Sequence, residues 1–176
     1  MFHYLVDGYN LLFRLFRSDR SFTERRSFMV AHLAEYSRLS KFQVTLVFDA
    51  YATEEEDHVI YRQAMRLVYT SYGETADDWI LAKLNKAKKS SHYQVVSSDQ
   101  RLVRLARDLG AHTLSAEEFL EELHRRHGKR AGKTEEETKE RGGEKVMREG
   151  LLDYYEKLFS ERYQQLLDKN KEGDGA

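Results

Sequence analysis

Short apolar runs alternate with longer segments of helical periodicity along residues 1–127, and this alternation constrains the fold more than any other feature. It is typical of a mostly parallel sheet whose strands are joined by helices that pack on its faces. We therefore expect an α/β domain with a central parallel sheet. The expected strands span residues 2–6, 43–48, 66–70, 92–96 and 111–114, and the expected helices span residues 10–16, 23–39, 76–89, 99–109 and 115–127.

The chain changes character after Arg126. Residues 128–143 are rich in charge and glycine and contain no aliphatic side chain larger than alanine, which predicts a solvated linker. Residues 144–170 place leucine, tyrosine and phenylalanine at three- and four-residue intervals, as in an amphipathic helix. We expect its apolar stripe to be buried by the domain, by a second copy in a homodimer, or by a foreign partner. Residues 171–176 are expected to be a disordered tail.

Composition excludes several classes of site. Cysteine is absent, so disulfides, thiolate zinc sites and a cysteine nucleophile are excluded, and the seven histidines show no metal-ligand spacing. No run approaches the roughly 18 apolar residues that a membrane span needs, and the amino terminus lacks a basic leader. We expect a cytoplasmic protein without a membrane partner. The formal net charge of −1 gives no global basic field for nucleic acid.

Acidic residues follow the expected strands. The residues just past three of the strand ends are Asp7, Asp49 and Asp99. The carboxyl ends of parallel strands share one edge of the sheet, where open α/β sheets bind their ligands. Thr75 is a candidate N-cap that places Asp77 and Asp78 in the first turn of the next helix, at the same edge. We therefore expect these carboxylates to gather.

Each acid also has a structural interpretation. Asp49 and Asp99 are of the type favoured in turns and at N-caps. Asp78 lies three residues after Thr75 and fits a variant of the capping box. Asp7 is harder to explain in this way, because a carboxylate beside a central strand is costly to bury without a cation.

Gathered carboxylates repel one another and raise each other's pKa unless a divalent cation neutralises them. Mg²⁺ or Mn²⁺ is the natural choice, since both are hard ions that take oxygen ligands. Such a metal acidifies a bound water and stabilises the leaving oxygen of a phosphodiester. The acidic residues therefore predict a phosphodiesterase without a side-chain nucleophile.

A resemblance to a known family rests on four segments: VDGYNLL, LVFDAY, VYTSYGETADDWI and VVSSDQ. In this order and spacing they resemble the NYN-domain group of PIN-like nucleases, and within it the YacP-like branch, which includes a ribosome-associated endoribonuclease. The resemblance covers about residues 1–125. It implies a PIN-like three-layer sandwich, a divalent metal site and cleavage of single-stranded RNA.

The same resemblance implies residue roles. Asp7 and Asp77 would be metal ligands, and Asp49 and Asp99 would complete the acidic site, Asp99 as a third candidate ligand. Asn10 would position a ligand or a water. Related chains often carry a further acid one helical turn beyond the aspartate of ETAD, where this chain has Leu81. This departure favours one tightly held metal over two.

Candidates for RNA contacts lie near the same edge. Tyr9 and Tyr51 are candidates for stacking on unpaired bases, although tyrosines at strand ends also pack half-buried. Arg101 and Arg104 recur at helical spacing and are candidates for phosphate contacts, although such clusters are also typical of solvated helix faces.

Two other functions fit parts of the pattern. A phosphatase with Asp7 as covalent nucleophile, as in haloacid-dehalogenase-like enzymes, needs a second aspartate two residues on, where Tyr9 stands. A non-cleaving RNA- or ribosome-binding protein would keep the fold and dock through the C-terminal helix. The four carboxylates favour the enzyme, and the resemblance implies an endoribonuclease whose substrate is single-stranded RNA, including mRNA in a ribosome-associated context.

Overall fold

A computed structural model describes residues 2–15, 21–40, 43–49, 58–62 and 65–130. Tyr51, the predicted linker from residue 131 on, the predicted C-terminal helix and the tail lie outside the described residues, whereas residues 128–130, predicted as linker, belong to the last described helix. In chain order the elements are β1 (His3–Asp7), α1 (Gly8–Leu15), α2 (Phe22–Ser40), β2 (Gln43–Phe48), β3 (His58–Arg62), β4 (Met65–Tyr69), α3 (Ala76–Asn85), the 3₁₀ helix η1 (Ser90–His92), β5 (Tyr93–Val96), α4 (Gln100–Asp108), β6 (His112–Leu114) and α5 (Ala116–Arg130).

The described strands form one six-stranded sheet in the order β3-β4-β2-β1-β5-β6. The five strands from β4 to β6 are parallel, which confirms the predicted α/β class. β3 was not predicted, and it pairs antiparallel to β4 at the edge of the sheet. Among the described strands its five residues pair with β4 alone, and they follow an acidic run, so the local sequence carries a weak strand signal.

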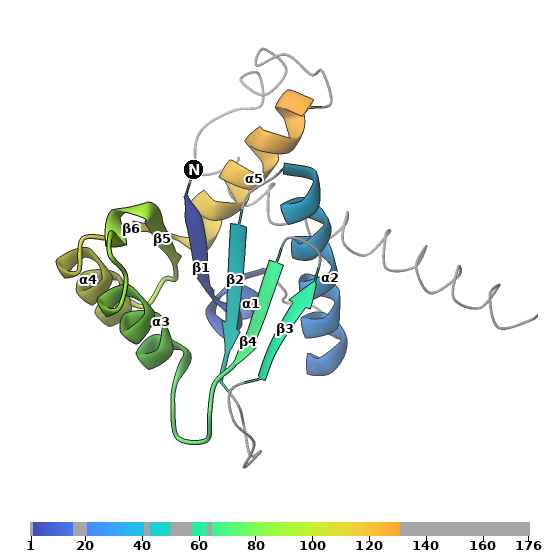
Figure 1. Cartoon of the computed structure of the whole chain (residues 1–176). Helices are drawn as coiled ribbons and strands as arrows, with labels where there is room; N and C mark the ends of the chain where they lie inside the picture. The colour runs from blue at the N-terminus through green and yellow to red at the C-terminus, as the bar shows by residue number, and fades with distance from the viewer. Residues whose placement is uncertain (1, 16–20, 41–42, 50–57, 63–64, 131–176) are drawn as a thin grey trace, which may run out of the picture.

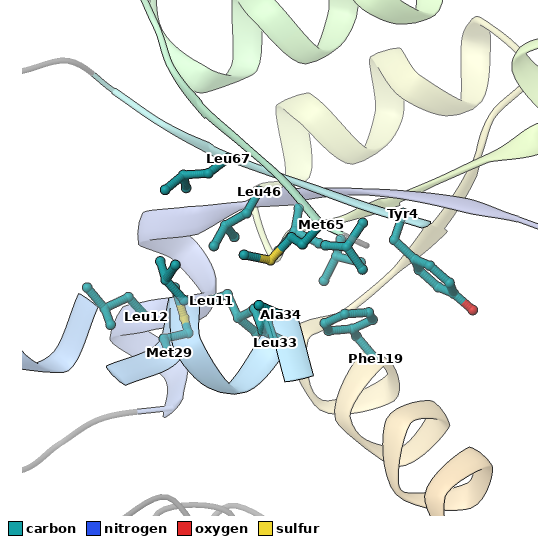
Figure 2. Packing of buried hydrophobic residues seen from close by; sticks show 14 of the residues in the cluster. Tyr4, Leu11, Leu12, Met29, Leu33, Ala34, Leu46, Met65, Leu67 and Phe119 are labelled. Carbon is teal, nitrogen blue, oxygen red and sulfur yellow. The ribbon is translucent and has the colours of Figure 1, made fainter. Parts of the chain in front are cut away.

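Helices cover both faces of the sheet and complete three layers (Figure 1). α1, α2 and α5 pack on one face, where Tyr4 and Val6 of β1 point, and Figure 2 shows this core at close range. α3 and α4 pack on the other face, where Leu5 points. Adjacent strands β1 and β5 lead to helices on opposite faces, so their carboxyl ends form the switch point at which such sheets bind ligands.

The predicted boundaries lie within about three residues of the observed ones, with one exception. The helix predicted over residues 76–89 ends at Asn85, and Lys86 is its C-cap. The next residues include only alanine as an apolar side chain, so little holds this segment on the sheet. None of the described helices is long and apolar enough to span a membrane.

His3 is a partly buried histidine at the start of β1. Its Nε2 lies 2.8 Å from the hydroxyl of Thr45, and its ring centroid is 5.3 Å from that of Tyr93. Burial lowers the pKa of His3 to about 4, and the charges of Lys83 and Arg66 contribute to this lowering. The folded protein therefore keeps His3 neutral where an unfolded chain would protonate it.

We expect His3 to make stability depend on pH. Between its unfolded pKa near 6.5 and its folded pKa of about 4, the unfolded state binds more protons, so stability present above pH 6.5 is lost as the pH falls. The His3→Gln variant should therefore lose less thermal stability than wild type between pH 7 and pH 5. Thermal melts of both proteins at the two pH values test this, and equal losses would contradict it.

Candidate active site

Asp7 is the last residue of β1, and α1 begins at the next residue without a loop. One carboxylate oxygen accepts the backbone N–H of Asn10 at 3.1 Å, and the other accepts the hydroxyl of Ser97 at 3.2 Å. The carboxylate is therefore held from both sides of the switch point. Burial raises the pKa of Asp7 despite these two hydrogen bonds, and the charges of Asp49 and Asp99 raise it further.

Gly8 explains why this abrupt turn from strand to helix is possible. It is buried, and a Cβ built there would lie 2.7 Å from the backbone oxygen of Val47 and against the ring of Phe48. A backbone carbonyl of a central strand cannot move aside as the end of a flexible side chain can. The glycine after Asp7 is therefore required by the close approach of α1 to β2.

Ser97 and Asn10 tie the ends of β1 and β5 together. The buried Ser97 hydroxyl accepts the backbone N–H of Asp99 at 3.1 Å while donating to Asp7. The side-chain oxygen of Asn10 accepts the N–H of Ser98 at 2.9 Å. Asn10 was expected to position a ligand or water, and in the structure its oxygen orders the turn after β5. Ser97 was missed, although a serine pair directly after a strand and before an N-cap was a usable signal.

Asp49 follows β2, and its carboxylate binds the start of α3, the helix that packs on the opposite face of the sheet from α1. Its Oδ1 accepts the backbone N–H of Ala76, the first residue of α3. The hydroxyl of Tyr9 donates to its backbone oxygen at 3.4 Å. Asp49 is therefore a cap, as its structural interpretation suggested, but of a helix far away in sequence.

Thr75 distinguishes the two neighbouring acids of α3. It is the N-cap: its hydroxyl accepts the N–H of Asp78 at 3.1 Å and donates to the Asp78 carboxylate at 2.8 Å. This is the capping arrangement predicted for Asp78, which is exposed. Asp77 is half-buried instead. Burial raises the pKa of Asp77 to about 6, together with the charges of Asp7, Asp99 and Asp49, while Arg101 opposes the shift.

Asp99 is the N-cap of α4. Its Oδ1 accepts the backbone N–H groups of Arg101 and Leu102 at 2.8 and 2.9 Å. The structural interpretation of Asp99 is therefore observed, and yet its charge still raises the pKa of Asp7 and Asp77. The cap holds the charge at the switch point.

We call these four carboxylates, Asp7, Asp49, Asp77 and Asp99, the acidic set. They lie close enough at one edge to repel one another. Within the described part of the chain, no three acidic or histidine side chains converge into a ready metal cage. The donors nevertheless suit a hard ion that uses one or two carboxylates and completes its shell with water and substrate oxygens. Asp7 and Asp77 fit that role best, because Asp49 and Asp99 each commit one oxygen to a helix cap.

The remaining candidates are placed as follows. Leu81, one turn after Asp77, packs with the core under α3 and α4 and adds no metal donor. Arg101 lies close enough to Asp77 to lower its pKa, and Arg104 is exposed one turn further along α4. The Tyr9 ring is partly buried among aromatic neighbours rather than open to solvent.

Comparisons with known proteins place this site in a family. The sequence model for the YacP-like NYN domain matches residues 4–160, and thus extends beyond the predicted limit of the resemblance near residue 125. The crystal structure of Rae1 (YacP) from Bacillus subtilis is 25% identical, has a TM-score of 0.55, and covers 99% of this chain and 97% of its own. The crystal structure of a mutant of the same Bacillus subtilis protein is 26% identical, has a TM-score of 0.56, and covers 88% of this chain and 99% of its own. No curated protein matched the chain.

Proposed function

We propose that this chain, which belongs to the YacP-like NYN domain family, is a metal-dependent endoribonuclease that cleaves single-stranded RNA. Its family and solved relatives indicate a nuclease-type, RNA-related function. The observation that carries the finer proposal is the repulsion within the acidic set. Burial raises the pKa of Asp7 and Asp77, the neighbouring carboxylates raise it further, and a bound cation would keep both groups ionised.

Asp7 and Asp77 would hold Mg²⁺ or Mn²⁺, and Asp99 has a second carboxylate oxygen at the same edge. When bound, the ion would supply an acidified water and would stabilise charge on the leaving oxygen. The other residues orient these ligands. Ser97 and the N–H of Asn10 fix the Asp7 carboxylate, and Asp49 fixes the start of α3 and with it Asp77.

Arg101 and Arg104 would bind the phosphates of the RNA. Arg101 lies beside Asp77, so a phosphate near the metal would meet a guanidinium there. Arg104 follows one turn later on the exposed face of α4. With arginines at these two positions, α4 would bind the RNA backbone next to the acidic set, although the protein has no net basic charge.

A cleavage assay tests the proposal. Purified protein is incubated with fluorescent single-stranded RNAs of several sequences and with Mn²⁺ or Mg²⁺, alone and with added ribosomes. We expect metal-dependent internal cleavage by wild type and by Asp78→Asn, whose exposed carboxylate accepts the hydroxyl of Thr75, and none by Asp7→Asn. An RNA that stays intact under all conditions but binds the protein would instead support the non-cleaving RNA- or ribosome-binding alternative.

Three further expectations stay predictions. A cytoplasmic location of the protein is predicted, and the ribosome is the predicted setting of cleavage. The C-terminal helix is expected to pack on the domain, on a second copy in a homodimer or on a foreign partner, but residues 144–170 lie outside the described residues.

Ser97→Ala should lower activity through Asp7. The change removes one of two hydrogen bonds to the Asp7 carboxylate and the acceptor for the N–H of Asp99. Partners that orient metal ligands typically contribute about 10–100-fold to activity or metal affinity. We expect a loss of that size in kcat and a lower affinity for Mn²⁺. Ser97→Thr, which keeps the hydroxyl, should restore the activity. An unchanged Mn²⁺ titration for Ser97→Ala would contradict a positioning role.

A further inference from the structure

Aromatic rings form a continuous chain from the surface to the acidic set. Phe13 of α1 is 60% exposed, and its ring centroid lies 6.2 Å from Phe22 and 6.3 Å from Tyr9. The Tyr9 ring lies 5.4 Å from Phe22 and 4.9 Å from Phe48, the residue before Asp49. We call Phe13, Phe22 and Tyr9 the aromatic track.

Guanidinium groups flank this track. Arg25 lies over the ring of Phe22 at 5.9 Å, and Arg26 lies over the ring of Tyr69 at 5.6 Å. Tyr69 in turn stacks on Phe48 with centroids 5.8 Å apart. An arginine that rests on a ring is held in place by the aromatic face while its N–H groups remain suited to phosphate. Rings and positive charge thus alternate on the side of α1 and α2.

We propose that Phe13, the exposed outer end of the aromatic track, stacks on an unpaired base of the RNA on the α1/α2 side of the acidic set, with Arg26 at a phosphate. This inference rests on the proposed function and names the part of the substrate that this surface binds. Every base has a π face, so such a track accepts many sequences. Bases inside a duplex are stacked on one another and cannot reach it, so the track selects single strands.

The position of Phe13 favours RNA over a protein partner. A single exposed phenylalanine is ordinary on a protein surface. Phe13, however, is the outer end of a ring series whose inner end donates a hydrogen bond to the backbone of Asp49. A nucleotide stacked there would adjoin the phosphate at the acidic set. A docked protein would gain nothing from that continuity.

Binding assays on the full chain test the inference. In an Asp77→Asn background, which should not cut, fluorescence anisotropy measures the affinity for a labelled single-stranded RNA. Phe13→Leu keeps an apolar side chain but removes the π face, and we expect affinity to fall about fivefold or more. Phe13→Tyr, which keeps a stacking ring, should bind like its parent. Binding of a fully paired RNA of the same sequence should not change with Phe13→Leu.

A second variant checks Arg26. Arg26→Lys keeps the charge but loses the planar group on Tyr69, and it should also weaken single-strand binding. The Phe13→Leu loss should persist at high salt, because stacking does not release counterions. Melting temperatures establish that each variant is folded.

The outcomes separate this inference from the proposed function. If wild type cuts RNA, and Phe13→Leu and Arg26→Lys bind and cut like their parents, the inference is overturned and the nuclease stands. If Phe13→Leu leaves RNA binding intact but changes the oligomeric state, the surface contacts a second copy instead. If no RNA is bound or cut by any form, both proposals fail.

Discussion

Asp77→Asn is expected to abolish cleavage and yet to raise the melting temperature of the metal-free protein. The activity loss should exceed about 100-fold, since even residues that only orient metal ligands contribute about 10–100-fold. The stability gain follows first from the partial burial of the Asp77 charge and then from its repulsion by Asp7, Asp99 and Asp49. The neutral amide removes both the burial cost and the repulsion at Asp77 and keeps the size of the side chain.

The size of this stability gain depends on pH. The folded protein raises the pKa of Asp77 from 3.8 to about 6, so the folded state binds its proton more tightly than the unfolded state does. Its contribution to stability therefore falls as the pH rises from about 4 to about 6 and stays low above that range. At pH 7.5 with EDTA we expect Asp77→Asn to melt about 2–4 °C above wild type, the size of a modest stabilisation for such a domain. Near pH 4 the difference should vanish.

Bound metal should reverse the order of the two melting temperatures. A ligand that binds only the folded state stabilises it by mass action, so millimolar Mn²⁺ should raise the melting temperature of wild type more than that of Asp77→Asn. The neighbouring Asp78→Asn is the matched control. Its exposed carboxylate accepts the hydroxyl of Thr75, so we expect a small loss of stability and wild-type cleavage. A metal-free Asp77→Asn that melts below wild type at pH 7.5 would contradict a net cost of the Asp77 charge in the folded protein.

The fold was predictable because its signals are local. Apolar runs mark the five parallel strands, and each of Asp7, Asp49 and Asp99 lies at or just after the end of a strand, so the order of elements already brings these acids to one edge. The Thr75 N-cap and its bond to Asp78 were also predictable, since both partners lie within one helical turn. By contrast, β3 is defined by its pairing with β4, and a five-residue segment does not by itself indicate which strand it pairs with.

The site was predictable in its charges but not in its contacts. Asp49 caps α3 across 27 residues, and Ser97 reaches Asp7 across 90. Such partners depend on strand order, which the sequence pattern alone leaves open. The same holds for Tyr9: its place beside the active edge was predicted, but not that Phe22 and Phe48 surround its ring. The residue types indicated a carboxylate site, but the contacts of each residue could be known only from the order of the strands in the sheet.

Gly8→Ala is expected to be the most destabilising single-methyl change near the site. The added Cβ would meet the carbonyl of Val47 at 2.7 Å as well as the ring of Phe48. Overpacking of this kind costs about 1–3 kcal/mol, and a clash with central-strand backbone belongs at the upper end. The strain can be relieved only by moving α1 away from β2, which would also move Asp7 and Asn10. Urea unfolding should therefore show a loss of about 3 kcal/mol, together with loss of metal-induced stabilisation and of cleavage.

Two variants isolate the clash from the general effect of replacing a glycine. Gly110→Ala places a side chain at a φ of +84° with open space around it, so it should cost only the strain of a left-handed residue, about 1–2 kcal/mol, with cleavage intact. Gly8→Ala combined with Phe48→Leu should recover only part of the loss, because the smaller side chain frees the ring position but leaves the Val47 carbonyl in place. Wild-type stability in Gly8→Ala, or full recovery in the double variant, would mean that the backbone of β2 does not set the position of Asp7.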